Sequence, residues 1–110
     1  MERGEVWQAD LGAKAGKRPV VILTRSGAIP YLNKLIVAEI TSHGKGYSTE
    51  VDIDQKANLP MPSFVQLDNI QTVPRPRFEE LIGTLDGATM KRISEKVVHA
   101  LNLEDAFSTP

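Results

Sequence analysis

Short apolar runs separated by glycine, proline and polar residues make up most of the chain. Runs of about four to ten residues rich in branched side chains, several of them alternating with polar residues, are typical of β-strands rather than helices. Proline disturbs a strand least at its first position, which is where Pro19 falls. In the predicted strand over residues 64–73, apolar and polar positions alternate imperfectly, which predicts a bulge. The predicted strands cover residues 4–11, 19–23, 35–40, 50–53, 64–73 and 81–85.

The periodicity changes from two to 3.6 after the last predicted strand. Asp86 is a suitable N-cap residue. Behind it, apolar residues recur on one face of a predicted helix at Met90, Ile93, Val97, Ala100 and Leu101. The tail from residue 104 to residue 110 lacks this pattern, and we expect it to fray. Many short strands followed by one helix predict a mainly β, α+β fold: a small twisted barrel with a C-terminal helix packed on it.

Length and composition narrow the possible classes of protein. The 110 residues predict one domain, covering residues 1–110. The absence of cysteine excludes disulfides and thiolate metal sites and fits a reducing cytosol, so we expect a cytoplasmic protein. The apolar runs are too short to span a membrane, and the N-terminus lacks the apolar core of a signal peptide. A net charge of −1 argues against bulk binding to duplex nucleic acid but leaves room for a local basic groove.

No common nucleotide-binding or hydrolase motif is present. The chain lacks a phosphate-binding P-loop, a dinucleotide-binding glycine motif, a zinc-protease helix and a serine-hydrolase elbow. Its two histidines are too few for a histidine-rich metal site. We therefore expect neither a metal nor a cofactor.

Two polar residues lie at the ends of predicted strands. Arg18 precedes the second strand and Thr41 follows the third. If these strands are antiparallel neighbours, the two side chains meet at one rim of the sheet. A guanidinium and a hydroxyl together can hold both non-bridging oxygens of a phosphodiester. The alternative is a surface arginine and a threonine that merely ends a strand.

Three further residues have both a chemical and a structural interpretation. Asp68 is a candidate acid or base, although Asp68 and Asn69 could simply form a bulge or turn. His43 can accept a proton near neutral pH, but a histidine in a glycine-rich loop is often only solvated. Trp7 either packs in the core or stacks on a base.

Four segments together carry a resemblance to a known family. They are Arg3-Gly4-Glu5-Val6-Trp7, Gly16-Lys17-Arg18-Pro19-Val20-Val21, Ile40-Thr41-Ser42 and the helix of residues 85–101. In this order they resemble the MazF/PemK family of toxin–antitoxin endoribonucleases, over residues 3–103.

The resemblance implies a fold, an activity and partners. The fold is an SH3-like barrel of the CcdB/PemK type that assembles as a homodimer, and a MazE-like antitoxin peptide neutralises it. The family cleaves single-stranded RNA with sequence preference and without metal. The ribose 2′-hydroxyl attacks the adjacent phosphate and leaves 2′,3′-cyclic phosphate and 5′-hydroxyl ends. The family's catalytic arginine and threonine match Arg18 and Thr41.

The chain also departs from the family pattern. An arginine and an aspartate that act in the PemK branch match Gln66 and Asp68, and a further family arginine is Gln71 here. The identity of the general base is open between Asp68, His43 and Arg18. Arg18 would have to be unusually perturbed, since a guanidinium ordinarily remains protonated. The candidate RNA-binding residues are Lys14, Lys17, Arg25, Ser42, Lys45, Asn69 and Gln71.

The main alternative function is a non-catalytic, CcdB-like toxin that inhibits a protein target such as gyrase. Proteins of that kind act through a largely apolar C-terminal end with an aromatic residue, whereas this chain ends on the polar segment of residues 104–110. An inert RNA-binding barrel is a third possibility. The sequence favours the nuclease.

Overall fold

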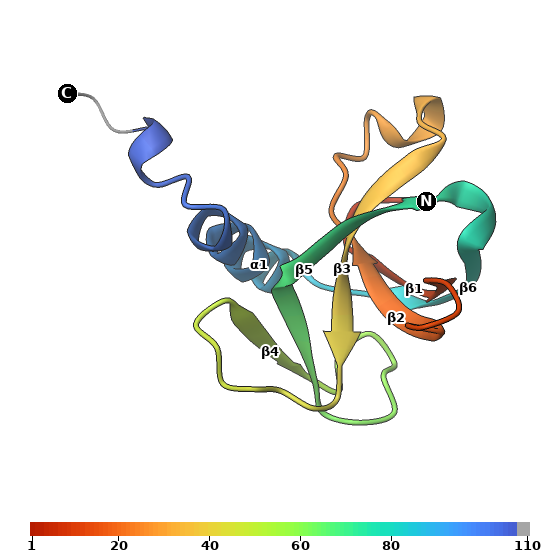
Figure 1. The fold of residues 1–110 in the computed structure, drawn as a ribbon, viewed down its shortest axis with the longest axis horizontal. Helices are drawn as coiled ribbons and strands as arrows, with labels where there is room; N and C mark the ends of the chain where they lie inside the picture. The colour runs from red at the N-terminus through yellow and green to blue at the C-terminus, as the bar shows by residue number, and fades with distance from the viewer. Residues whose placement is uncertain (108–110) are drawn as a thin grey trace.

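Six strands form one antiparallel sheet in the computed structural model, which describes residues 1–107. The order across the sheet is β4-β5-β3-β2-β1-β6, and helix α1 packs beside β4 and β5 (Figure 1). The strands are β1 (Glu5–Asp10), β2 (Lys17–Ile22), β3 (Lys34–Thr41), β4 (Glu50–Asp54), β5 (Ser63–Pro74) and β6 (Phe78–Thr84). The helix is α1 (Gly87–Ala100), and three 3-10 turns cover Ile29–Tyr31, Arg75–Arg77 and Asp105–Phe107. The mainly β fold with a C-terminal helix is confirmed.

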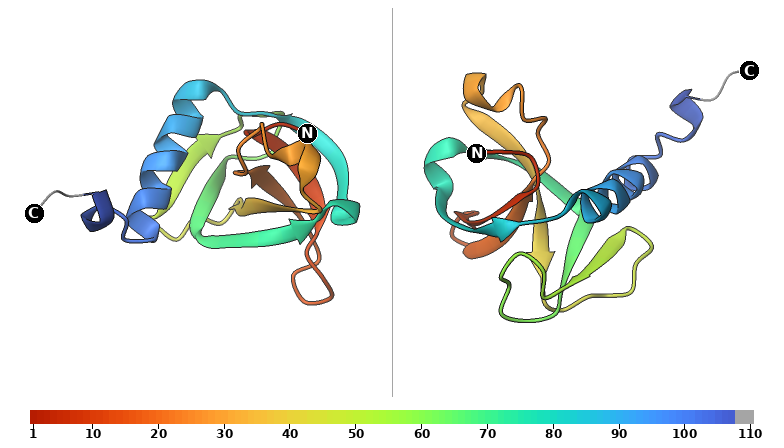
Figure 2. Two further views of the ribbon diagram at one scale, coloured as in Figure 1. Left: turned by 90° about the horizontal axis from the view of Figure 1, so that it is seen from above. Right: turned by 180° about the vertical axis from the view of Figure 1, so that it is seen from behind.

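The sheet is curled, so that the connection after β4 at one edge reaches β6 at the other edge (Figure 2). Asn58, which follows β4, donates a hydrogen bond from Nδ2 to the carbonyl oxygen of Ile82 in β6, at 3.0 Å. A Cβ atom at Gly83 would lie 2.4 Å from the carbonyl oxygen of Ala57, so a glycine is required for this close approach. The connection between β4 and β5 is thereby held against β6, and the curled sheet closes around its core.

Two groups of buried side chains fill the interior. Excluding such apolar surface from water is the main source of stability for a domain of this size. The first group lies between the sheet and α1 and contains Val6, Val21, Ala38, Ile40, Val51, Ile53, Leu59, Val65, Leu67, Leu85 and Ile93. The second is formed by residues of β1, β2, β3, β5 and β6 and of the first 3-10 turn, and contains Ala9, Val20, Ile22, Ile29, Leu35, Val37, Val73 and Phe78.

β2 begins two residues earlier than the sequence predicts. Lys17 and Arg18 are already paired with β1, so Arg18 is part of the strand rather than ahead of it. Pro19 is therefore the third strand residue. It is tolerated because the pairing of β2 with β3 begins only at Val20, so the missing N–H has no partner to lose on that side.

β6 also begins earlier, at Phe78 instead of Leu81. The reason is Phe78 itself, which is buried opposite Ala9 and meets the Trp7 ring edge-on, with the ring centres 6.2 Å apart. Trp7 thus packs against the second core group, as the structural interpretation expects. The predicted bulge is present in β5, where the pairing with β3 shifts between Ala38 and Glu39.

The predicted helix is confirmed with Asp86 as its N-cap. Ile93 is fully buried, and Met90, Val97 and Ala100 pack against the first core group. Leu101 is not part of this face: the helix ends at Ala100, and the Leu101 side chain is 54% exposed. In the predicted frayed tail, Asp105–Phe107 forms a 3-10 turn, and residues 108–110 lie outside the described residues. No helix in the described part of the chain has both the length and the apolar character needed to cross a membrane.

Candidate functional site

Arg18 and Thr41 line one pocket of about 260 Å³ at the rim of the sheet. The pairing of β2 with β3 places Val20 opposite Glu39, and the same register continued by two residues places Arg18 opposite Thr41. The two side chains expected at one rim are therefore brought together. We call this cavity the Arg18 pocket.

The other walls of the Arg18 pocket come from two connections. Ser42 and His43 follow β3 directly, so the strand that carries Thr41 also places these two residues. The opposite wall is the connection between β4 and β5, with Leu59, Pro60, Met61 and Ser63. This is the segment that β6 holds in place through Ile82 and Gly83.

The guanidinium of Arg18 is exposed and partly fixed. Its Nε donates a hydrogen bond to the carbonyl oxygen of Ala15, at 3.0 Å. The two terminal nitrogens have no partner among residues 1–107, so they can donate to an anionic oxygen in the pocket. An anchored planar fork of this kind suits phosphate.

The hydroxyl groups beside Arg18 are held by the backbone and by His43. Thr41 Oγ1 accepts a hydrogen bond from the backbone N–H of His43, at 3.0 Å, which leaves its own hydrogen available for donation. Ser42 Oγ lies 3.1 Å from His43 Nδ1, so Nε2 is the ring nitrogen without a partner among the described residues. The pocket thus combines a cation, a hydroxyl donor and an imidazole.

Four of the candidate residues line a different and smaller pocket, of about 140 Å³. Its lining consists of Lys45, Gln66, Asp68 and Asn69 together with Tyr47, Thr49 and Glu50. None of these residues lines the Arg18 pocket. Thr49 Oγ1 donates to Asp68 Oδ2 at 2.6 Å, and Asn69 Nδ2 donates to Gln66 Oε1 at 3.1 Å. The structure therefore separates Asp68 and Gln66 from Arg18 and Thr41 while keeping them on the same sheet.

Glu50 also lines this smaller pocket, and the sequence analysis did not select it. Its carboxylate accepts hydrogen bonds from the backbone N–H groups of Lys45 and Gly46 and from Gln66 Nε2, all at 3.0 to 3.1 Å. These bonds, led by that from Gln66, lower the pKa of the Glu50 carboxyl below its usual value. Its position directly after a glycine-punctuated connection is a weak signal in the sequence.

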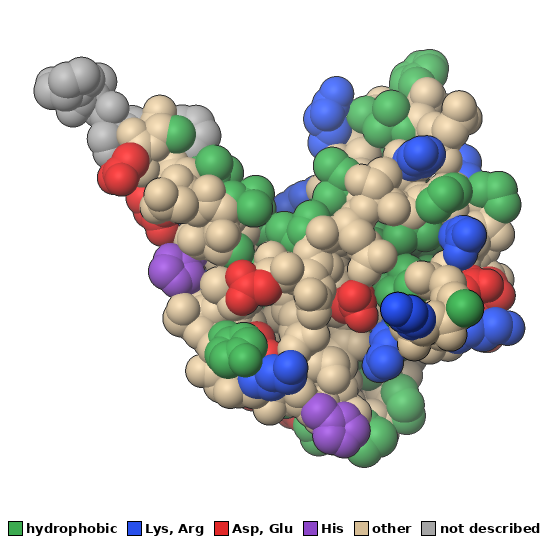
Figure 3. Space-filling view, viewed as in Figure 1, with side chains coloured by type: hydrophobic (Ala, Val, Ile, Leu, Met, Phe, Trp, Pro, Cys, Tyr) green, Lys and Arg blue, Asp and Glu red, His purple; other side chains and the backbone are tan. Residues whose placement is uncertain are grey.

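The remaining candidates are spread around the sheet. Gln71 Nε2 donates to Glu39 Oε2 at 2.8 Å, and Lys17 Nζ lies 3.3 Å from Glu79 Oε1. Lys14 is exposed in the connection between β1 and β2, near the start of β2, whereas Arg25 lies beyond the opposite end of that strand. On the face shown in Figure 3, most of the visible Lys and Arg side chains lie over the half formed by β1, β2 and the neighbouring connections.

The chain matches known proteins over most of its length. Residues 2–101 match the family described as PemK-like, MazF-like toxin of type II toxin–antitoxin systems. The protein named endoribonuclease MazF3 from Mycobacterium tuberculosis is 38% identical over 87 residues, covering 79% of this chain and 84% of the relative.

Two solved structures share the fold. Mycobacterium tuberculosis toxin MazF-mt6 superposes with a TM-score of 0.83 at 35% identity, covering 89% of this chain and 96% of that one. An endoribonuclease in complex with its cognate antitoxin, from a mycobacterial species, superposes with a TM-score of 0.81 at 24% identity and covers 100% and 99% of the two chains. The family match extends over nearly the whole chain, including both strands that form the Arg18 pocket, and the protein therefore belongs to the PemK-like, MazF-like toxins of type II toxin–antitoxin systems.

Proposed function

We propose that the protein is an endoribonuclease that cleaves single-stranded RNA with sequence preference and without a metal ion or cofactor. The observation that carries the proposal is the Arg18 pocket, in which a fixed guanidinium and a hydroxyl donor face one cavity. Membership of a toxin family with relatives named endoribonuclease supports the same activity.

The proposed reaction is an internal transfer at one phosphate. The ribose 2′-oxygen attacks the adjacent phosphorus, the bond from phosphorus to the 5′-oxygen breaks, and the products carry a 2′,3′-cyclic phosphate and a 5′-hydroxyl. Arg18 stabilises the negative charge of the crowded phosphorane, and Thr41 donates a hydrogen bond to one of its oxygens. The leaving 5′-oxygen takes a proton from solvent.

His43 is the general base in this proposal. Of the three open candidates, Asp68 lies in the smaller pocket, and a guanidinium is a poor base because it stays protonated. His43 lines the same pocket as Arg18 and has Nε2 available for the 2′-hydroxyl proton. The geometry of the two pockets therefore favours His43.

Neighbouring nucleotides are bound outside the Arg18 pocket in this proposal. The smaller pocket around Gln66, Asp68 and Asn69 lies along the same sheet and suits a flanking nucleotide. The proposed RNA-contacting residues are Lys14, Lys17, Arg25, Ser42, Lys45, Asn69 and Gln71, of which Arg25 requires a strand that extends beyond the far end of β2.

The whole chain acts in this proposal as one cytoplasmic toxin domain, assembled as a homodimer. A cognate, MazE-like antitoxin peptide neutralises it, because an acidic segment can occupy the same basic surface as RNA. Sedimentation velocity of the purified chain measures the association state directly.

Replacing Arg18 tests the proposed activity. Arg18→Ala is expected to lower kcat by about a hundred- to a thousandfold, since it removes the charge that stabilises the phosphorane. The protein should fold normally because Arg18 is exposed. The measurement is single-turnover cleavage of a labelled RNA, with analysis of the ends, and Lys91→Ala, at an exposed cation on α1, is the control.

A substrate with 2′-deoxyribose at the scissile nucleotide should resist cleavage completely, because the nucleophile is missing. Equal cleavage of the deoxy substrate would refute the mechanism. A protein that leaves RNA intact but loses its toxicity when residues 104–110 are deleted would instead support the CcdB-like alternative. Binding of RNA without any cyclic-phosphate product would support an inert RNA-binding barrel.

A further inference from the structure

The carboxylate of Glu50 binds backbone N–H groups in the connection between β3 and β4, which we call the β3–β4 loop (residues 42–49). One oxygen, Oε1, accepts from the backbone N–H groups of both Lys45 and Gly46 at 3.0 Å. Gly46 has a φ of +76°, a conformation that favours glycine, and successive N–H groups that converge in such turns form a concave anion site. In addition, the N–H of Glu50 donates to the carbonyl oxygen of Tyr47 at 3.1 Å. Glu50 therefore binds the loop through both its side chain and its backbone.

The carboxylate is itself held in place from β5. Gln66 Nε2 donates to Glu50 Oε2 at 3.0 Å, and Gln66 Oε1 in turn accepts from Asn69. Gln66 stands opposite Glu50 in the pairing of β4 with β5, so the register of the sheet sets this contact. The loop is thus attached to two strands rather than only to the residue that ends it.

The last residue of the loop is bound directly to β5. Thr49 Oγ1 donates to Asp68 Oδ2 at 2.6 Å, and the N–H of Leu67 donates to the carbonyl oxygen of Thr49 at 3.1 Å.

Two further contacts hold the loop nearer its start and on the side of the helix. Gly44 lies flat on the Phe64 ring, where a Cβ atom would come within 2.8 Å of the ring carbon Cδ2. Ser48 Oγ lies 3.0 Å from His99 Nε2 on α1. The loop therefore follows a fixed path between the sheet and the helix, although most of its side chains are exposed.

The fixed loop begins inside the Arg18 pocket. Ser42 and His43 are its first residues and line the pocket, and the N–H of His43 donates to Thr41 Oγ1. Only Gly44 separates His43 from Lys45, the first residue whose N–H Glu50 binds. A shift of the loop at Lys45 and Gly46 is thus transmitted to the imidazole and to the threonine hydroxyl.

We propose that Glu50 is a positioning residue of the nuclease: by holding the β3–β4 loop, its carboxylate fixes His43 and Thr41 relative to Arg18. This inference rests on the proposed nuclease function. The carboxylate oxygens are suited to the role because they accept all of these bonds at once, whereas a glutamine would have one acceptor oxygen and would direct an N–H group at another donor. A misplacement of about 1 Å at a reacting group can lower a rate by about a hundredfold.

The first experiment measures the loop without RNA. In NMR spectra, the amide protons of Lys45 and Gly46 should shift as Glu50 is titrated with acid and should exchange slowly with solvent at neutral pH. Glu50→Ala should remove the acid-dependent shift and speed exchange at these two amides while leaving the amides of β1 and β2 unchanged. Glu80→Ala, at an exposed glutamate on β6, is the matched control for Glu50→Ala. Unchanged exchange at Lys45 and Gly46 in Glu50→Ala would overturn the proposal.

The second experiment separates positioning from RNA binding. The substrate is a short RNA that spans the scissile phosphate but does not reach the smaller pocket. On it, Glu50→Ala should lower kcat by about ten- to a hundredfold with little change in KM, and Glu50→Gln should lie between this variant and the wild type. Glu80→Ala should match the wild type. A rise in KM alone would overturn a positioning role, as would an unchanged kcat in a variant whose loop amides have become exposed. If the wild-type protein itself leaves RNA intact, the nuclease function fails and this proposal fails with it, while the amide measurements still show whether Glu50 holds the loop.

Discussion

Within the Arg18 pocket, His43 is the one lining residue that can accept a proton near neutral pH. An imidazole acts as a base only in its neutral form, so protonation at low pH should stop cleavage. His43→Gln preserves hydrogen-bonding ability at this position but cannot take the 2′-hydroxyl proton. We expect this variant to lower kcat by about a hundred- to ten-thousandfold, the range for loss of a general base.

The pH profile identifies the role of His43 more sharply than the rate alone. In the wild type, kcat should rise with pH as the general base loses its proton, and His43→Gln should lack this rise. His99→Gln provides the comparison, because it removes the other histidine and its contact with Ser48 but leaves His43 in the pocket. A rise with pH that disappears in His99→Gln and persists in His43→Gln would exclude His43 as the base.

The position of some site residues could be predicted from the sequence, and that of others could not. The rim position of Arg18 and Thr41 followed from strand ends and antiparallel pairing, which depend on local patterns. Glu50 was missed because its partners come from a loop and from β5, and no periodicity encodes the path of a loop. The separation of Asp68 from Arg18 likewise depends on the bulge in β5, whose presence the sequence predicted but whose geometry it did not.

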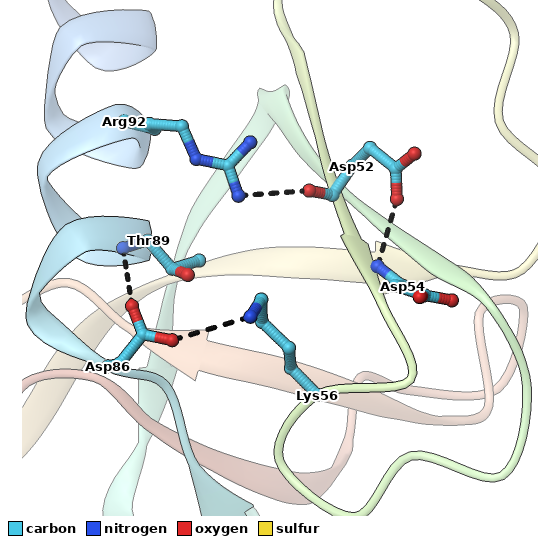
Figure 4. A network of polar contacts seen from close by, with 6 residues as sticks. All are labelled: Asp52, Asp54, Lys56, Asp86, Thr89 and Arg92. Atoms are coloured by element: carbon cyan, nitrogen blue, oxygen red, sulfur yellow. Dashed lines mark hydrogen bonds and ion pairs between the residues drawn. The ribbon is translucent and has the colours of Figure 1, made fainter.

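Among the elements, α1 makes a connected set of polar contacts with the β4 side of the sheet in its first two turns. Asp86 Oδ1 accepts a hydrogen bond from the Thr89 N–H at 2.7 Å, and Oδ2 lies 3.5 Å from Lys56 Nζ (Figure 4). One turn further, Arg92 Nη2 donates to the carbonyl oxygen of Asp52 in β4, at 3.2 Å. The cap therefore fixes the helix at the place where it leaves β6 and meets β4.

Replacement of Asp86 should separate its capping role from its charge. Asp86→Ala removes the acceptor and should lower Tm by several degrees, whereas Asp86→Asn keeps a good cap and should lower it less. The hydrogen bonds from Thr89 lower the pKa of the Asp86 carboxyl from its ordinary value of 3.8. Thermal melts at neutral pH measure the first effect.

The acid dependence of the same variants follows from the direction of that shift. Because the carboxyl pKa is lower in the folded protein, the charged form stabilises the fold above about pH 4, and this contribution is lost as the pH falls through the folded-state pKa. The difference in Tm between the wild type and Asp86→Asn should therefore shrink between pH 5 and pH 2. A difference that stays constant over this range would show that the charge of Asp86 contributes nothing.

The boundaries of the elements show where sequence patterns lose information. The helix and its cap were predicted correctly because periodicity and capping chemistry agree there. β2 and β6 begin earlier than predicted because Lys17, Arg18 and Phe78 join the sheet through pairing with β1, which is a tertiary contact. Similarly, Leu101 fits the apolar spacing but falls after the last helical residue, and it is exposed.

For the whole molecule, the distribution of charge matters more than its sum. A net charge of −1 provides no general attraction for RNA. Affinity must therefore come from cations near the proposed sites. Lys17 is paired with Glu79, whereas Lys14 in the neighbouring connection has no partner among the described residues. We therefore expect Lys14 to contribute more of the RNA affinity than Lys17.

The dependence of RNA binding on salt tests this expectation. For a single strand, the slope of log K against log salt concentration is about −0.7 for each phosphate contacted. Lys14→Ala should make the slope less steep by about 0.7 and weaken binding of every RNA sequence equally, since a phosphate contact carries no sequence information. Binding is measured with the inactive Arg18→Ala protein as background, and Lys91→Ala on α1 is the matched control. An equal loss for Lys91→Ala would mean that RNA responds to the total charge of the protein, whereas a loss confined to Lys14→Ala would place a phosphate beside the connection that leads into Arg18.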